Sequence, residues 1–273
     1  MTSDFYGVTP QTVLGSDLER ALEELSIRGF TVMENVVAPS DLPELRNRLD
    51  RVYETQRSEL GADFSLEEIQ EENQVRAPLC YDDRFLELAT LARPLEAVRT
   101  VLGRYFVIQQ QIGIINQPNT ENRQAVWHRD LLYHDFVISR PLAVSVMVCL
   151  DDFSVETGGT VAVPFTHRVE RMPSNEYIAK HAVTIEARAG SIFLQDSMLI
   201  HKAGYNSSRG PRRGINTIYV SGLLKQQINL PSQLRGKHAD DPFLNMLLGY
   251  DAEPSASVLD WRKRRHRKQA KPR

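Results

Sequence analysis

The spacing of apolar residues changes near residue 105 and divides the chain into two parts. Between residues 16 and 100 apolar side chains recur at helical intervals, as Leu18, Leu22 and Leu25 do. A short strand over 29–33 and a second helix from about residue 42, with an early proline, follow the first helix. These apolar stripes are typical of helices that pack against a core, so the first part is predicted to be mainly helical.

From about residue 105 the apolar positions alternate with a period of two, which predicts strands. Turn signals rich in glycine, proline and asparagine separate these segments. The predicted strands cover residues 106–114, 142–150, 159–163, 182–187, 191–195 and 215–223. Helices followed by a run of short strands favour a mainly β protein, in which a jelly roll is buttressed by the N-terminal helices.

The organisation along the chain predicts one domain with a short tail. Neither an internal repeat nor a low-complexity linker interrupts the sequence, and apolar residues make up 41% of it, which is enough for a full core. We expect a domain over 1–260, with a helical part at 16–100, a jelly-roll core at 105–225 and a C-terminal cover at 226–260. Residues 261–273 are expected to be a basic, flexible tail.

The net charge of −2 is unevenly distributed. Eight of the 33 lysines and arginines lie in residues 262–273, which contain no acid, so the rest of the chain has 25 basic and 35 acidic residues. An acidic body argues against a nucleic-acid-binding core, because phosphate contacts need a clustered basic face. The tail is typical of a solvated chain end, although contact with an anionic partner stays open.

Cysteine usage and the absence of targeting signals predict a cytoplasmic location. Cys80 and Cys149 lie far apart and form no CxxC motif, which favours a reducing compartment. The N-terminus has no basic and apolar leader pattern, and no apolar stretch approaches the length of a membrane span. We expect a protein without a membrane span, as a monomer or homodimer.

The most informative motif is Trp127-His128-Arg129-Asp130. On an extended strand, residues two apart point to the same side, so His128 and Asp130 can aim at one point while Arg129 turns away. One imidazole and one carboxylate are two of the three ligands of the facial triad in non-haem iron(II) oxygenases. An HxD motif alone is weak, because a histidine near an aspartate is often only a hydrogen-bonded pair.

The third ligand is predicted to be His201, which follows a further run of strands and turns. Arg212 and Arg213 come next, at the start of the strand over 214–220. A guanidinium there can form two hydrogen bonds to a planar carboxylate. A dicarboxylate that chelates a metal through one end needs such a partner at its other end. The order of HxD, histidine and arginine therefore indicates a metal site.

Three stretches resemble the phytanoyl-CoA dioxygenase family of 2-oxoglutarate oxygenases. They are His128-Arg129-Asp130, the segment Glu156-Thr157-Gly158-Gly159 through His167, and the segment from Gly190 through His201-Lys202-Ala203-Gly204 to Arg212. The match spans roughly residues 20–225. The resemblance implies a double-stranded β-helix (cupin-like) fold and the use of iron(II), 2-oxoglutarate and O2.

The resemblance also assigns roles to individual residues. It implies that His128, Asp130 and His201 bind the metal and that Arg212, by its spacing, binds the far carboxylate of 2-oxoglutarate. Gln111 is similar in placement to a residue that contacts the cosubstrate in relatives, and Gln109 is expected on the same face. Relatives often have a serine two positions after the distal histidine, where this chain has Ala203, so Arg212 is left with more of the binding. Asp130 also argues against halogenation, because halogenating relatives have a small residue there.

The substrate is the least determined part. Candidates for its pocket are Trp127, Tyr133, His134, Asp135, Met147 and His167. A small natural-product or related metabolite is favoured, because the body shows no long basic stretch suited to the phosphates of an acyl-CoA; an acyl-CoA or lipid substrate is the alternative within the family. Hydroxylation is the first expectation, with epimerisation, cyclisation and desaturation left open. A cupin-like binding protein without redox chemistry is the alternative outside the enzymes.

Overall fold

The computed structural model describes residues 11–120, 123–131 and 137–270. Its helical first part holds helices α1 (Asp17–Arg28), α2 (Leu42–Glu59), α3 (Leu66–Ile69), α4 (Asp83–Ala89) and α5 (Ala92–Leu102), with strands β1 (Phe30–Met33) and β2 (Gln74–Arg76). The strand-rich part holds β3 (Phe106–Asn116), β4 (Ala143–Cys149), β5 (Val161–Ala162), β6 (Val183–Thr184), β7 (Ile192–Asp196), β8 (His201–Lys202) and β9 (Arg212–Ser221), with α6 (Asn175–His181). Helices α7 (Leu230–Leu234), α8 (Pro242–Leu247) and α9 (Val258–Ala270) complete the chain.

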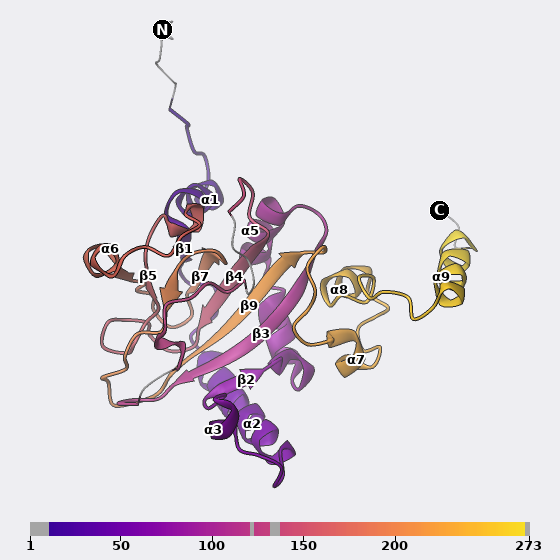
Figure 1. Cartoon of the computed structure of the whole chain (residues 1–273), viewed down its shortest axis with the longest axis horizontal. Helices are drawn as coiled ribbons and strands as arrows, with labels where there is room; N and C mark the ends of the chain where they lie inside the picture. Colours follow the sequence, from indigo (N-terminus) through magenta and orange to yellow (C-terminus); the bar gives the residue numbers. More distant parts are fainter. Residues whose placement is uncertain (1–10, 121–122, 132–136, 271–273) are drawn as a thin grey trace, which may run out of the picture.

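Two antiparallel sheets form the scaffold. The larger has the strand order β1-β7-β4-β9-β3-β2, and the smaller has the order β6-β5-β8. In the larger sheet the long strands β3 and β9 cross the centre of the molecule side by side (Figure 1). The smaller sheet contributes His201 through β8, and isolated bridges at His128 and Asn206 extend the pairing around it. The strands predicted from the period-two pattern are therefore present at nearly the predicted positions.

One face of the larger sheet is covered by helices and holds the main hydrophobic core. Leu45, Leu49 and Val52 of α2 are buried in this core, as the apolar stripe of that helix predicts. Helix α1 starts with a complete capping box, in which the N–H groups of Ser16 and Glu19 each donate to the side chain of the other residue. The helices thus stabilise the sheet from one side and leave its other face free for a cavity.

A bulge in β3 decides which of its side chains face the cavity. The pairing with β9 shifts register between Ile108 and Gln110. Before the shift Ile108 belongs to the helix-side core; after it Ile115 belongs to that core, whereas Ile112 and Ile114 pack on the opposite side. One inserted residue reverses the faces of all the residues that follow it.

One expectation about the fold needs correction. The helices together contain more residues than the strands, so the chain is not mainly β, because five helices precede β3 and others follow β9. The basic segment, expected to be a flexible end, forms helix α9 as far as Ala270. This helix stands apart from the sheets at the C-terminal end (Figure 1).

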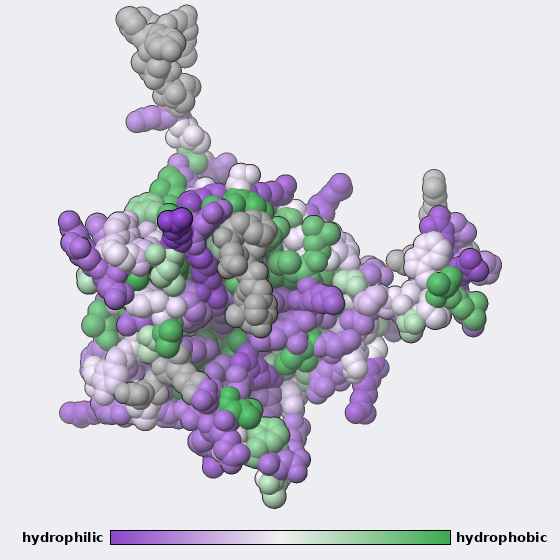
Figure 2. Space-filling model, in the orientation of Figure 1, coloured by the Kyte–Doolittle hydropathy of each residue, from purple (hydrophilic) through white to green (hydrophobic). Residues whose placement is uncertain are grey.

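The described residues contain no helix that is both long enough and apolar enough to cross a membrane. On the face shown in Figure 2, hydrophobic residues form scattered groups among hydrophilic ones.

Close packing of α2 on the sheet makes a first prediction. A Cβ atom at Gly113 would lie 2.4 Å from Leu49 Cδ1 and 3.1 Å from Val75 Cβ. Gly113→Ala is therefore expected to lower the free energy of unfolding by about 1–3 kcal/mol, since extra atoms in a filled core force neighbours apart. Chemical denaturation measures this.

The matched control is Gly210→Ala, because a Cβ atom there meets nothing within 4 Å. It should change the unfolding free energy by less than about 0.5 kcal/mol. Equal stability of the two variants would contradict the packing of α2 described above.

Candidate metal centre and cosubstrate site

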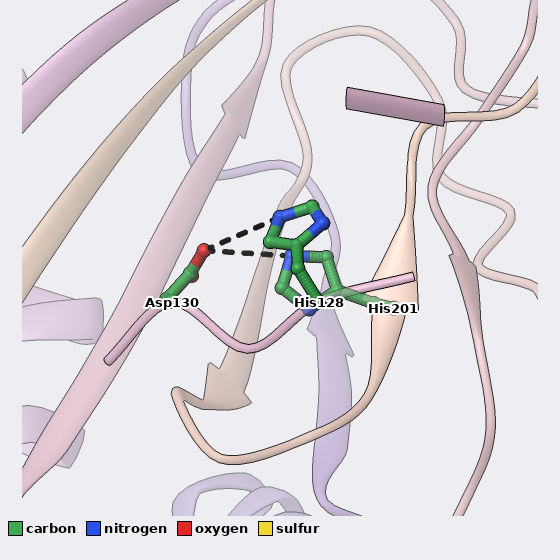
Figure 3. Close-up of side chains that lie close together, drawn as sticks. All are labelled: His128, Asp130 and His201. Atoms are coloured by element: carbon green, nitrogen blue, oxygen red, sulfur yellow. Dashed lines mark ion pairs between the residues drawn. The ribbon is translucent and has the colours of Figure 1, made fainter. Parts of the chain in front are cut away.

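A backbone bridge brings the two histidines together. The N–H of His128 donates to the carbonyl of His201 at 3.0 Å, and the N–H of His201 donates back to the carbonyl of His128 at 3.0 Å. Residues paired in this way point their side chains to the same side of the sheet. The two imidazole ring centroids consequently lie 4.4 Å apart (Figure 3).

Each histidine is held with its Nε2 atom toward Asp130. Nδ1 of His128 lies 2.7 Å from the carbonyl of Val126, and Nδ1 of His201 lies 2.9 Å from that of Leu199. A proton on Nδ1 satisfies each carbonyl and leaves Nε2 as a lone-pair donor. Nε2 lies 3.9 Å from Asp130 Oδ1 in His128 and 3.5 Å in His201 (Figure 3).

The carboxylate of Asp130 is oriented by two hydrogen bonds to its other oxygen. Ser145 Oγ donates to Oδ2 at 2.5 Å, and Gln195 Nε2 donates to it at 3.1 Å. Ser197 Oγ lies 2.8 Å from Ser145 Oγ and extends the network. Because Oδ2 is occupied, Oδ1 is the oxygen presented to the histidines.

The charges of the three side chains match this arrangement. Burial raises the pKa of Asp130, but His201, His128 and the Ser145 hydrogen bond lower it by more, so the net shift is downward. Burial, together with repulsion from His201, lowers the pKa of His128. Burial also lowers the pKa of His201, but Asp130 raises it by more. Asp130 is thus ionised and His128 neutral at neutral pH, which are the forms that bind a metal.

These three groups form a metal-binding set. One ligand atom from each of His128, Asp130 and His201 lies within 4.8 Å of the others. Two imidazoles and one carboxylate on one side of an ion are the facial triad of non-haem iron(II) enzymes, which leaves the remaining coordination positions open. The structure therefore brings together all three ligands predicted from the sequence.

Arg212 lies in the same cavity and is only 2% exposed. Its Nη2 donates to the Gly158 carbonyl at 2.7 Å, and its guanidinium carbon lies 4.2 Å from the centroid of the Phe153 ring. Its Nε atom has no hydrogen-bond partner, and it forms no ion pair with any residue that the structure describes. Burial lowers the pKa of Arg212 to about 10, so it still carries its charge at neutral pH.

The cavity combines an apolar floor with polar walls. Its lining residues are Ile112, Ile114, Gln124, His128, Asp130, Met147, Thr160, Phe193, Gln195, His201, Lys202, Ala203, Arg212 and Asn216. Two further buried atoms of this lining, Gln195 Oε1 and Asn216 Oδ1, have no hydrogen-bond partner among the residues that the structure describes. A buried polar group without a partner is costly, so the cavity is built to be completed by a bound molecule.

Gln111 and Gln109 do not line this cavity, which corrects the expectation that they contact the cosubstrate. Gln111 is fully buried on the helix side, where its amide binds the N–H of Leu79, the carbonyl of Phe85 and Thr217 Oγ1. Gln109 lies at the bulge itself. Strict alternation from Val107 would place Gln111 in the cavity, but the bulge puts Ile112 there instead.

The other pocket candidates are placed as follows. Met147 lines the cavity, as expected. Trp127 packs against Val163, Ile178 and Ile200 outside it, with Lys202 Nζ 5.0 Å from its ring centroid.

His167 also lies away from the cavity, with Nε2 3.1 Å from the carbonyl of Ser26. This contact places its ring against the C-terminal part of α1. Tyr133, His134 and Asp135 lie outside the described residues.

Several residues of the site were not predicted from the sequence. Ser145, which donates to Asp130, lies two positions before Met147 on β4, and Gln195 lies two positions after Phe193 on β7. Period-two alternation within β4 and β7 was the signal that could have found them. Asn216 follows Arg212 on one face of β9 by the same rule.

The fold and this site define the class of iron- and 2-oxoglutarate-dependent dioxygenases. The family model described as "Phytanoyl-CoA dioxygenase (PhyH)" matches residues 27–214. The chain therefore belongs to the phytanoyl-CoA dioxygenase family.

Relatives and solved structures agree with this assignment. The chain is 30% identical over 217 residues to Uncharacterized protein Rv1501 of Mycobacterium tuberculosis, a match that covers 78% of this chain and 79% of the relative. The crystal structure of EctD from S. alaskensis with 2-oxoglutarate and 5-hydroxyectoine has a TM-score of 0.62 and 21% identity, covering 75% of this chain and 76% of that one. The epimerase SnoN from nogalamycin biosynthesis has a TM-score of 0.58 and 21% identity, covering 75% and 83%. At these identities the two structures establish the shared fold.

The hydrogen bond from Ser145 generates a second prediction. Ser145→Ala leaves Asp130 with one fewer donor on Oδ2, so the carboxylate can turn away from the histidines. We expect the dissociation constant for Fe(II) to rise about ten- to a hundredfold, the usual effect of removing a partner of a metal ligand. Anaerobic competition with a chromophoric chelator measures this.

Thr217→Val is the control, because it removes a buried hydroxyl from the opposite face of the same sheet, where Thr217 binds Gln111. It should leave metal affinity unchanged even if it lowers stability. Equal losses of affinity in both variants would mean that Ser145 acts through general packing rather than through Asp130.

Proposed function

We propose that the protein uses iron(II), 2-oxoglutarate and O2 to oxidise a C–H bond of a small organic molecule, most simply by hydroxylation. The metal and cosubstrate, when bound, supply the oxidising chemistry. The chain's own residues bind, orient and shield the reactants. The proposal adds a reaction and a substrate class to the family membership established above.

The single observation that supports it best is the unpaired cation beside the metal ligands. Arg212 is buried, charged and without an acidic partner among the described residues, while its Nε atom has no acceptor. A buried charge is costly unless it is paired, and a carboxylate accepts two parallel hydrogen bonds from a guanidinium. A dicarboxylate that reaches from the metal to Arg212 satisfies both sites at once.

The surrounding residues fit this cosubstrate. Ala203 lines the cavity where relatives often carry a serine, so its methyl group offers no hydrogen bond. Phe153 holds the guanidinium from one side and Gly158 accepts from it, which fixes its direction. Arg212 therefore provides the main attraction for the distal carboxylate.

The walls of the cavity control what reaches the metal. Ile112, Ile114 and Phe193 form an apolar floor that limits access of water. Exclusion of water strengthens the electrostatic interactions inside and prevents side reactions. Epimerases share this fold as well, so the fold alone does not select the reaction; hydroxylation is proposed because it requires no further reactive group from the protein.

Anaerobic titration tests the proposal directly. Addition of Fe(II) and 2-oxoglutarate to the purified protein should produce the weak visible metal-to-ligand charge-transfer band, and His201→Ala should abolish it. Circular dichroism checks that the variant is folded. A folded wild-type protein that gives no band would refute the proposal and favour a binding protein without redox chemistry.

Arg212 yields a prediction about cosubstrate affinity. Arg212→Ala should raise the dissociation constant for 2-oxoglutarate at least about tenfold, the scale of one lost charge-assisted hydrogen bond. The same visible band measures it, and Fe(II) affinity should be retained because Arg212 does not touch the metal ligands.

Arg213→Ala is the matched control from the neighbouring position. Arg213 points to the other side, where it pairs with Asp50 at 2.8 Å and Asp151 at 3.4 Å. Its loss should leave the affinity for 2-oxoglutarate unchanged. A larger effect at Arg213 than at Arg212 would mean that Arg213, and not Arg212, binds the carboxylate.

A further inference from the structure

A second hollow lies next to the metal cavity. This groove, between α3, β2 and the end of β3, shares the lining residues Ile114 and Gln124 with the cavity. We call it the amide groove. Its polar lining residues are Tyr53, Glu67, Glu72, Asn73, Gln74, Asn116, Gln117, Thr120 and Gln124.

Side-chain amides of the amide groove are hydrogen-bonded to one another. Gln124 Nε2 donates to Gln74 Oε1 at 3.4 Å, and Gln117 Nε2 donates to Asn73 Oδ1 at 3.3 Å. These bonds pair Gln124 with Gln74 of β2, and Gln117 of the segment after β3 with Asn73. The carboxylates of Glu67 and Glu72 contribute negative charge to the same lining.

The charge balance of the amide groove is one-sided. Among the residues whose side chains the structure describes, two carboxylates and no lysine or arginine line it. The described lining of the adjoining cavity has one lysine, Lys202, and one arginine, Arg212. The ammonium of Lys202 lies over the ring of Trp127. A polyanion such as a CoA phosphate would therefore meet like charge at the amide groove.

The cavity itself supplies an independent indication. Gln195 is 3% exposed and Asn216 is 7% exposed, and each has a side-chain oxygen without a donor in 11–120, 123–131 or 137–270. The Nε2 atom of Gln195 is already used toward Asp130, so its Oε1 atom requires a donor from elsewhere. If Arg212 binds the cosubstrate, the groups of the cavity that still lack a partner are these two oxygens, which accept hydrogen bonds from a donor.

We propose that the metal cavity and the amide groove together bind a small amine: a cationic molecule rich in N–H and O–H donors. Glu67 and Glu72 are the acceptors for its ammonium group, and a donor nearer the metal satisfies Gln195. This inference rests on the proposed function, because it names the substrate class of the same site. It argues against an acyl-CoA, whose phosphates would meet the carboxylates of Glu67 and Glu72 in the amide groove.

Paramagnetic broadening by Mn(II) in place of iron tests the charge preference directly. The full-length protein, in excess over Mn(II) and saturated with 2-oxoglutarate, is mixed separately with glucosamine, N-acetylglucosamine and glucuronate. The broadening of the probe protons reports how often each probe lies near the metal. Glucosamine should be broadened most and glucuronate least, with a ratio of about threefold, the size expected from two partly exposed ion pairs.

A double variant and a control connect the preference to the amide groove. Glu67→Gln with Glu72→Gln should bring the three probes to similar broadening. Glu68→Gln removes a neighbouring exposed carboxylate on α3 that does not line the groove, so the wild-type order should persist.

Two results would overturn the inference: equal or stronger broadening of glucuronate in the wild type, or an unchanged order in the double variant. Failure of the proposed function is visible separately, because Mn(II) would then not broaden the protons of 2-oxoglutarate.

Discussion

The paired backbone hydrogen bonds between His128 and His201 are the constraint on which the site depends. They join two segments far apart in the chain and set both imidazoles on one side. The next inward-facing residue on the first segment is Asp130, whose N–H donates to the carbonyl of Ser197 at 2.9 Å. Two short stretches of strand pairing therefore determine the position of every metal ligand, before any metal is present.

This arrangement buries charged groups, which costs free energy. The protein compensates the charge of Asp130 more fully than the charge of Arg212. Asp130 receives donors from Ser145 and Gln195 and lies beside two histidines, so its charge is well compensated. Arg212 has a carbonyl and an aromatic face but no described acid. An uncompensated buried cation destabilises a fold, which gives a physical reason for a site that an anionic molecule completes. Asp130 is thus held in place for the metal by the protein itself, whereas Arg212 is left to pair with an anionic ligand.

The sequence was sufficient to predict the metal ligands because their geometry is local. Alternation along a strand places His128 and Asp130 together without any knowledge of the rest of the fold. The order of later motifs then identified His201 and Arg212. By contrast, the cosubstrate role expected of Gln111 came from its similar placement to a residue of relatives, and a bulge in β3 that no local signal marks turns it to the other face. The glutamine instead supports the helical layer, where it binds the N–H of Leu79 and Thr217 Oγ1.

The amount of helix was likewise hard to foresee. The N-terminal apolar stripes predicted helices against the sheet, but the helices beyond β9 have short apolar patterns, and α9 is strongly basic. Ser145 and Gln195 were accessible in principle from alternation, yet small polar residues in buried strands have many roles. Only their contacts with Asp130 distinguish these two from ordinary buried polar residues.

The two faces of the larger sheet explain how one scaffold combines stability with variable chemistry. Helices cover one face and bury Leu49 and its neighbours, so that side contributes most of the apolar burial. The other face carries Met147, Asn216 and Arg212 on the neighbouring strands β4 and β9, and these three side chains line the metal cavity. A change at such a position alters the cavity without removing a contact from the helical layer. The fold and the metal ligands can therefore persist while the residues that line the cavity change.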